Sequence, residues 1–147
     1  MFISELLLNE MAPNEYRICA DKIKQEFRNS GVDLVLTTHV ADQVAYKPDR
    51  ADMVSPEIFM ETMRAILTAF NNRKLGKYIY MASKKPESHA LFKHKFQTPD
   101  GGSGTANTPC AIAKLKGTTP FKFTIITFMV KDNYQNDNFP QDSVMWI

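Results

Sequence analysis

Three histidines and a run of lysines are the residues of this chain whose types and spacing could do chemistry. His39 lies in the segment Leu34–Val44, where a short β-branched run gives way to an amphipathic helix. A histidine at such a junction is outside the main-chain ladder and near the positive end of the helix, which can hold its ring in a defined protonation state. The position therefore suits general acid or base chemistry near neutral pH. The alternative is a structural histidine that partners the start of the helix.

The positive charge is concentrated in the second half of the chain. The net charge is +2, but residues 1–73 carry 8 Lys and Arg against 11 Asp and Glu, whereas residues 74–147 carry 10 against 5. The surplus is densest between residues 74 and 95, where six lysines accompany one acid, Glu87, with His89 and His94 interleaved. Clustered cations attract polyanions, above all phosphate backbones. This predicts contact with RNA or another polyanion, and a solvated lysine-rich face is the alternative.

These residues define a candidate site. The predicted catalytic residues are His39, His89 and Lys85, and the predicted nucleic-acid-binding residues are Arg50, Lys84, Lys93, His94 and Lys95. His89 and His94 are separated by an odd number of positions, so in a regular strand they point to opposite faces and at most one shares a site with His39. The hypothesis requires that His39 and the lysine-rich segment line one cleft.

Other chemistries find little support in the sequence. The two cysteines, Cys19 and Cys110, have no zinc-ligand spacing, so we expect two small core residues and neither a metal nor another cofactor. Residues 97–109 hold three of the six glycines and almost no apolar residue, which predicts a mobile loop. The glycine-rich stretch at 101–105 lacks the lysine and the helix start of a phosphate loop, so we expect a flexible hairpin connection. No apolar run reaches the roughly 18 residues of a membrane span, and the first residues lack the basic start of a secretory signal. A cytoplasmic or particle-enclosed protein is expected.

The apolar pattern predicts helices in the first half and strands in the second. With 147 residues, 44% of them hydrophobic, the chain can build a single core. Helices are expected over about residues 14–30 and 55–74, with a break at Pro13, and strands over 32–36, 78–81, 89–96, 110–115 and 121–130, the last one central. The fold class predicted is α+β, with N-terminal helices packed on an antiparallel sheet of about four strands.

The domain prediction is a single domain over residues 1–147. Residues 1–12 are an amphipathic leader or docking helix, residues 13–131 the core, and residues 132–147 a polar tail. The apolar end of this tail, residues 144–147, is expected to pack on the body or on a partner.

The predicted arrangement is a helical N-terminus, a short strand, a helix start with His39, a capped helix and an antiparallel sheet with a basic hairpin. Over roughly residues 32–131 it resembles the RelE-type ribonuclease fold, including RegB-type phage endoribonucleases. Thr37–Val44 is similar to the "[ST]-x-H-x-x-[DE]-R" helix start of that group, and Phe123–Phe128 is similar to its late strand. Gln43 stands where an arginine is usual, and Arg50 can replace it only if the intervening turn folds back. The resemblance implies metal-independent RNA cleavage with His39 at the family position, in which a base deprotonates the 2′-hydroxyl and cations stabilise the phosphate.

The first ten residues resemble the leader that sends internal proteins into phage proheads, and Leu8-Asn9-Glu10 is similar to the site cut by the maturation protease. This resemblance implies a protein of the infected host cytoplasm or of the phage particle; a plain docking helix is the alternative. Three functions follow as hypotheses: an endoribonuclease, a noncatalytic module that binds nucleic acid or a host protein, and an internal or structural virion protein. No membrane partner is expected, and the oligomeric state is not predicted.

Overall fold

The computed structural model describes the backbone of residues 2–44, 56–98, 101–116 and 120–147, and the side chains of residues 16–41 and of those from 57 onward within these ranges. The described chain forms the following elements: α1 (Phe2–Asn29), β1 (Val32–Leu36), α2 (Thr38–Val44), α3 (Pro56–Asn71), α4 (Gly76–Lys84), β2 (Ser88–Gln97), β3 (Ser103–Lys114), β4 (Phe121–Ile125), β5 (Met129–Val130), the 3-10 helix η1 (Gln141–Ser143) and β6 (Val144–Trp146).

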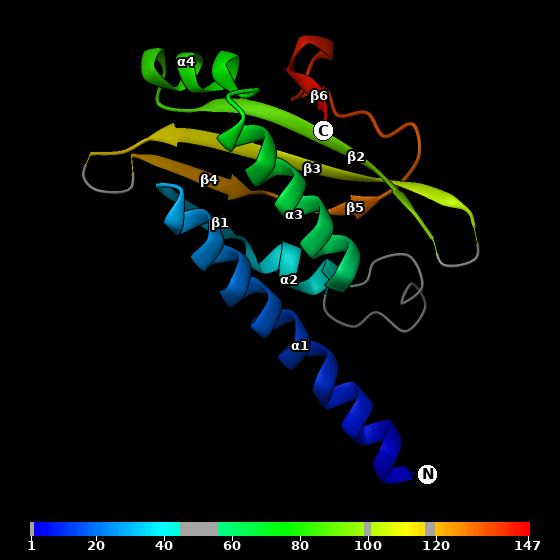
Figure 1. Cartoon of the computed structure of the whole chain (residues 1–147). Helices are drawn as coiled ribbons and strands as arrows, with labels where there is room; N and C mark the ends of the chain where they lie inside the picture. Colours follow the sequence, from blue (N-terminus) through cyan, green and yellow to red (C-terminus); the bar gives the residue numbers. More distant parts are fainter. Residues whose placement is uncertain (1, 45–55, 99–100, 117–119) are drawn as a thin grey trace.

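The strands form one mixed sheet in the order β1-β4-β3-β2-β6, with β5 paired to β3 (Figure 1). The edge strands β1 and β6 pair in parallel with β4 and β2, whereas β3 pairs antiparallel with β2, β4 and β5. The α+β class is confirmed. The expected sheet of about four antiparallel strands is wrong, because the sheet has six strands and both of its edges are parallel pairs.

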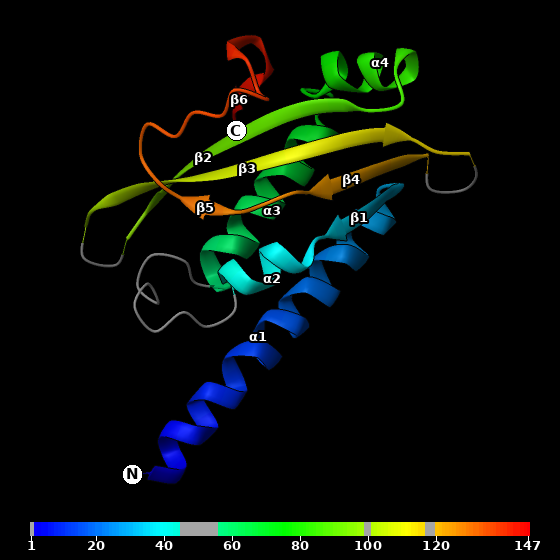
Figure 2. The same cartoon turned by 180° about the vertical axis from the view of Figure 1, so that it is seen from behind.

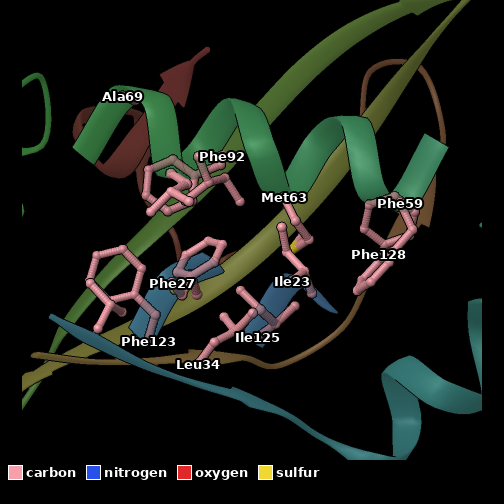
Figure 3. Packing of buried hydrophobic residues seen from close by; sticks show 14 of the residues in the cluster. Ile23, Phe27, Leu34, Phe59, Met63, Ala69, Phe92, Phe123, Ile125 and Phe128 are labelled. Carbon is pink, nitrogen blue, oxygen red and sulfur yellow. The ribbon is translucent and has the colours of Figure 1, made fainter. Parts of the chain in front are cut away.

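Helices α1 and α3 pack against one face of this sheet, and the opposite face is turned toward the viewer in Figure 2. The core between them is rich in phenylalanine, and Figure 3 shows rings from α1, α3 and the strands meeting there. Phe27 and Phe123 meet edge to face with their centroids 6.2 Å apart, and Phe59 and Phe128 do so at 5.5 Å. Such pairs add to the stabilisation that burial of each ring provides. This packing fixes the positions of the strands that carry the candidate residues.

Residues 78–81 belong to helix α4 and not to the predicted strand. Leu75, Tyr78 and Ala82 are buried, and their spacing of three and four residues is helical. Tyr80, two positions after Tyr78, is exposed. The aromatic and β-branched composition favoured a strand, but the burial of one helical face decides the structure. The lysine-rich segment at residues 74–95, expected to contain two strands, is therefore a helix followed by a strand.

The predicted strand over residues 121–130 is interrupted after Ile125. Cys110 pairs with Ile125, but Asn107 pairs with Met129, so the β4–β5 side carries one more residue than β3 and forms a bulge. Pro109 lies opposite this bulge and has no N–H to continue the ladder. The extra residue shifts the side-chain alternation, which lets both Ile125 and Phe128 face the core. The central strand is β3 and not this segment.

The polar segment before Pro109 is strand rather than loop. Residues 103–109 form the first half of β3, and only residues 98–102 connect the hairpin. Gly104 lies under the ring of Phe96, where an added Cβ would be 2.6 Å from the ring. Glycine is therefore needed for close packing at this position, and its presence does not signal mobility.

The N-terminal segment differs from expectation, whereas the C-terminal end packs on the body as expected. Helix α1 continues through Pro13 without the predicted break and extends away from the rest of the molecule at its N-terminal end (Figure 1). The apolar end of the tail packs on the body as β6, which pairs with Leu91–Lys93 of β2. Neither cysteine forms a disulfide; Cys110 is buried, and Cys19 packs at the border of the core.

Candidate nucleic-acid interface

His39 lies at the strand-to-helix junction that the sequence predicts. Helix α2 begins at Thr38, two residues after β1 ends, and the His39 side chain is exposed. The junction is held by Thr37, whose hydroxyl donates to the main-chain oxygen of Ile126 over 2.9 Å. Among the described residues, no hydrogen bond or ion pair orients the His39 ring.

The structure does not bring His39 together with the lysine-rich segment. His39 follows β1 at one edge of the sheet, and β4 and β3 lie between β1 and β2. With neighbouring strands about 4.8 Å apart, β1 and β2 are separated by roughly 14 Å. A general acid and base must reach the same phosphate, so His39 and His89 do not form one site in this arrangement. Arg50 lies outside the described residues.

Two of the predicted catalytic residues do meet at another place. His89 and Lys85 both line a cavity of about 710 Å³ between α4 and the segment that precedes β6. Lys77, Tyr80 and Asp142 also contribute to its wall. Because β2 starts immediately after α4, the helix and the first residues of the strand present these side chains to one opening.

The His89 ring is oriented by a carboxylate. Its Nε2 lies 2.9 Å from Glu87 Oε1, and its ring contacts the Phe139 ring with a centroid separation of 5.6 Å. A carboxylate only accepts hydrogen bonds, so Nε2 is the donor and a neutral ring keeps Nδ1 as an acceptor. Both groups are solvent-exposed, so the pair adds little to stability, and its effect is on orientation and tautomer.

Tyr80 is the exposed aromatic group beside these cations. Its side chain is 61% exposed, and the Nζ of Lys84 lies 5.4 Å from the centre of its ring. Lys77, Tyr80 and Lys84 follow a spacing of three and four residues, so they share one face of α4. Lys77 Nζ donates to the main-chain oxygen of Asp142, which ties α4 to η1. We call the group formed by Lys77, Tyr80, Lys84, Lys85 and His89 the α4 surface.

The remaining predicted binding residues separate from this surface. Lys95 is exposed farther along β2, whereas Lys93 is buried under the C-terminal segment. His94 faces the helices: its Nε2 lies 2.7 Å from Glu61 Oε2 of α3, and its Nδ1 lies 3.1 Å from the main-chain oxygen of Ile147. His89 and His94 thus face opposite sides of β2, as their spacing predicts. His94 connects three elements and is not part of the α4 surface.

Sequence reasoning missed the contribution of residues 131–143. This polar stretch follows β5 and covers part of β2, bringing Asp142 beside Lys77 and Tyr134 beside Lys93. It therefore adds acidic groups to a region that the sequence shows as almost purely basic. The apolar residues 144–147 predict that this end packs on the body, but nothing in the polar stretch indicates where it crosses the sheet.

Metal-ligand clusters and membrane-spanning helices are both missing from the described part of the chain. No group of three or more His, Cys, Asp or Glu side chains there could hold a metal ion. None of the helices described is long and apolar enough to span a membrane.

Burial raises the pKa of the Cys110 thiol, which keeps this side chain protonated and unreactive.

The architecture is that of an α+β domain with an open mixed sheet, helices α1 and α3 on one face, and a cationic aromatic surface at α4. Comparison of the chain with family models, with curated proteins and with solved structures gives no match.

Proposed function

We propose that the α4 surface binds single-stranded RNA. The observation that carries this proposal is the exposed ring of Tyr80 with Lys84 Nζ 5.4 Å from its centre. Unpaired bases stack on exposed aromatic rings, and neighbouring lysines neutralise the phosphates between them. Lys77, Lys84 and Lys85 supply three positive charges around this ring, against Glu87 and Asp142. A duplex offers no free base face to Tyr80, so an unpaired strand fits this surface best.

The binding test uses fluorescence anisotropy of a labelled single-stranded RNA at low salt. Removing both Lys84 and Lys85 by substitution with Ala should weaken binding and reduce the slope of log affinity against log salt by about 0.7 for each phosphate that is no longer neutralised. The matched control is Lys22→Ala with Arg28→Ala, which removes the same charge from exposed positions of α1. Equal weakening by both pairs would show that only net charge matters and would overturn the proposed surface.

The Tyr80 ring gives a second, charge-independent test. Tyr80→Ala should weaken RNA binding by about 1–3 kcal/mol because a stacking platform is removed. Tyr80→Phe keeps the ring and should bind as the wild type does. If Tyr80→Ala binds like the wild type, stacking on this residue is excluded.

Cleavage of the bound RNA is a second candidate function, and the Glu87–His89 pair favours it. In this reaction His89 Nδ1 takes the proton of a ribose 2′-hydroxyl, the 2′-oxygen bonds to phosphorus, and the 5′-oxygen leaves with a proton from water. The products are a 2′,3′-cyclic phosphate and a 5′-hydroxyl end. A true base contributes about 10²- to 10⁴-fold, so His89→Ala should lose metal-independent cleavage while His39→Ala keeps it. Equal cleavage by wild type and His89→Ala would remove His89 from the reaction.

Two narrower statements are part of this proposal: the chain is related to the RelE-like ribonucleases, and it is a phage protein. They rest on the resemblance of Thr37–Val44 and of the first ten residues to those groups. Mass analysis of purified phage particles tests the phage setting: a form that starts at Met11 is expected if the leader is cut after Glu10. Recovery of only the uncut chain outside particles would contradict it.

A further inference from the structure

A second cavity lies on the sheet face that is not covered by α1 and α3. It has a volume of about 480 Å³, with Leu91 and Lys93 of β2 as its floor and residues 133–141 as much of its wall. Trp146 of β6 also borders it, and Pro140 lines both this cavity and the one beside α4. We call this cavity the Lys93 pocket. Its size is within the range of small-ligand sites, about 300–1,000 Å³.

Lys93 places an ammonium group at the floor of the pocket without a counter-ion. The residue is only 7% exposed, and its Nζ donates to the main-chain oxygen of Tyr134 over 2.8 Å. An ammonium has three N–H donors, yet in the described ranges the Lys93 Nζ makes this one hydrogen bond only. No carboxylate of a described residue lies within ion-pair distance of it. A buried charge is costly unless it is paired, so two unused donors beside an open cavity indicate where an anion can bind.

Aromatic rings surround the same ammonium group. The centre of the Tyr134 ring lies 5.9 Å from Lys93 Nζ, and that of the Trp146 ring lies 5.8 Å from it. These contacts compensate part of the charge, and burial still lowers the pKa of Lys93. Trp146 remains 59% exposed, so its indole offers a surface on which a planar group can stack. A ligand with a negative charge and a flat ring could therefore contact both Lys93 and Trp146.

The polar part of the wall selects among such ligands. Gln135 and Gln141 line the pocket, and no hydrogen bond engages their amides within the described chain. Each amide offers a donor and an acceptor, which is the pattern that the edge of a nucleobase presents. Asp137 also lines the pocket and disfavours a ligand with many negative charges. One phosphate group joined to one base satisfies these conditions.

We propose that the Lys93 pocket binds a single nucleotide, with its phosphate on Lys93, its base on Trp146, and the amides of Gln135 and Gln141 at the edge of the base. The nucleotide is either a free nucleoside monophosphate or one unit of a bound RNA strand. This site goes beyond the proposed function, because it concerns another cavity and does not use the α4 surface. Its failure would leave RNA binding at α4 unaffected.

The only tryptophan of the chain reports on this pocket directly. We would titrate the full chain with the four 5′-nucleoside monophosphates, with the corresponding nucleosides and with inorganic phosphate, and follow Trp146 fluorescence. Saturable quenching is expected with at least one monophosphate, and its nucleoside and phosphate alone should bind at least tenfold more weakly. The absence of a saturable change with every monophosphate and with a short single-stranded RNA would overturn the proposal.

Two variants assign the binding to named groups. Lys93→Met keeps an unbranched chain and removes the charge, so affinity should fall about tenfold or more. The matched control is Lys95→Met, which removes an exposed charge two residues along the same face of β2 and should bind like the wild type. Gln141→Ala lies on the exposed η1 and should weaken binding of the preferred base severalfold without affecting folding. Wild-type affinity in both Lys93→Met and Gln141→Ala would also overturn the proposal.

The source of the nucleotide is decided by comparing a monophosphate with a short RNA in the variant that lacks Lys84 and Lys85. Similar affinities for the two identify a free nucleotide as the ligand. Tighter binding of the RNA, with competition by the monophosphate, identifies one unit of a strand. Both results support the pocket, and failure of the monophosphate to compete with an RNA that quenches Trp146 would contradict it.

Discussion

The two edges of the sheet are both parallel pairs, but they are stabilised differently. At the β1 edge, apolar side chains of β1 and β4 lie against α1 and α3, and Phe123 contacts both Phe27 and Phe70. At the β6 edge, three residue pairs join β6 to β2, and side-chain hydrogen bonds of Lys93 and His94 accompany them. Burial of apolar area makes the larger contribution to the free energy of folding. The contribution of the polar contacts depends in addition on the charge state of the groups and on competing water. We therefore expect the side chains of the β1 edge to contribute more to the free energy of unfolding than those of the β6 edge.

Truncating one apolar side chain at each edge tests this difference most directly. Phe123→Ala should lower the free energy of unfolding by about 3–5 kcal/mol, because a fully buried ring leaves a cavity. Met145→Ala of β6 should cost about 1 kcal/mol, since the Met145 side chain is only partly buried. Urea unfolding of both variants gives the two values. Equal losses would remove the distinction between the edges.

Asn107 lies on β3, between the two edges, and a substitution there tests how much its side-chain hydrogen bonds stabilise the protein. Its Nδ2 donates to the main-chain oxygens of Met129 over 3.2 Å and of Lys131 over 2.8 Å, which ties the chain after the bulge to β3. Asn107→Ala leaves these oxygens without their donor and should destabilise the protein by about 2–3 kcal/mol. Gln97→Ala, at an exposed end of β2, is the control and should be close to neutral. A change below about 0.5 kcal/mol for Asn107→Ala would show that water replaces the amide at no cost.

The buried charge at the β6 edge predicts a pH dependence. Burial lowers the pKa of Lys93 below its ordinary value of 10.5, so the unfolded chain binds its proton more tightly than the folded chain does. The contribution of Lys93 to stability therefore rises with pH between its folded pKa and 10.5. Unfolding of wild type and Lys93→Met, compared across this interval, should show the wild type gaining relative to the variant. A constant difference would contradict a lowered pKa of Lys93.

The smallest expected effect is an increase in stability, whereas the truncations of Phe123, Met145 and Asn107 lower it. Thr108 lies on β3 with its hydroxyl buried, and no hydrogen-bond partner for it is found in the described chain. Thr108→Val removes this hydroxyl while keeping the shape of the side chain, so stability should increase by about 1 kcal/mol. Thermal unfolding measures the change. A loss of stability would imply that an ordered water satisfies the hydroxyl in solution.

Sequence reasoning worked where signals were local. The run Val32–Leu36, the helix start at Pro56 and the alternation in residues 89–96 predict elements that the structure contains. It failed where distant residues decide the outcome. The composition of residues 78–81 favours a strand, but the core selects the helical face of Tyr78, and the continuous apolar run 121–130 is broken because Pro109 of another strand lies opposite it.

The candidate site also has features that local sequence signals predict and features that distant residues decide. The sequence shows the cluster of cations and points to Lys85 and His89 as candidate site residues. In the structure both residues line one cavity. The separation of His39 from them depends on strand order, which the sequence does not reveal. The burial of Lys93 depends on the polar segment that crosses β2, and the composition of that segment is indistinguishable from that of a solvated tail.

The parallel pairing of β1 with β4 has a consequence for synthesis on the ribosome. Thr37 and its partner Ile126 are 89 residues apart, so β1 has no strand to pair with until most of the chain has emerged. At about 5–20 residues per second, this wait lasts roughly 4–18 seconds. During it the nascent chain carries the apolar side chains of Val32 and Leu34 without the neighbours that β4 will supply. This edge of the sheet is therefore completed late in synthesis, once β4 has been made.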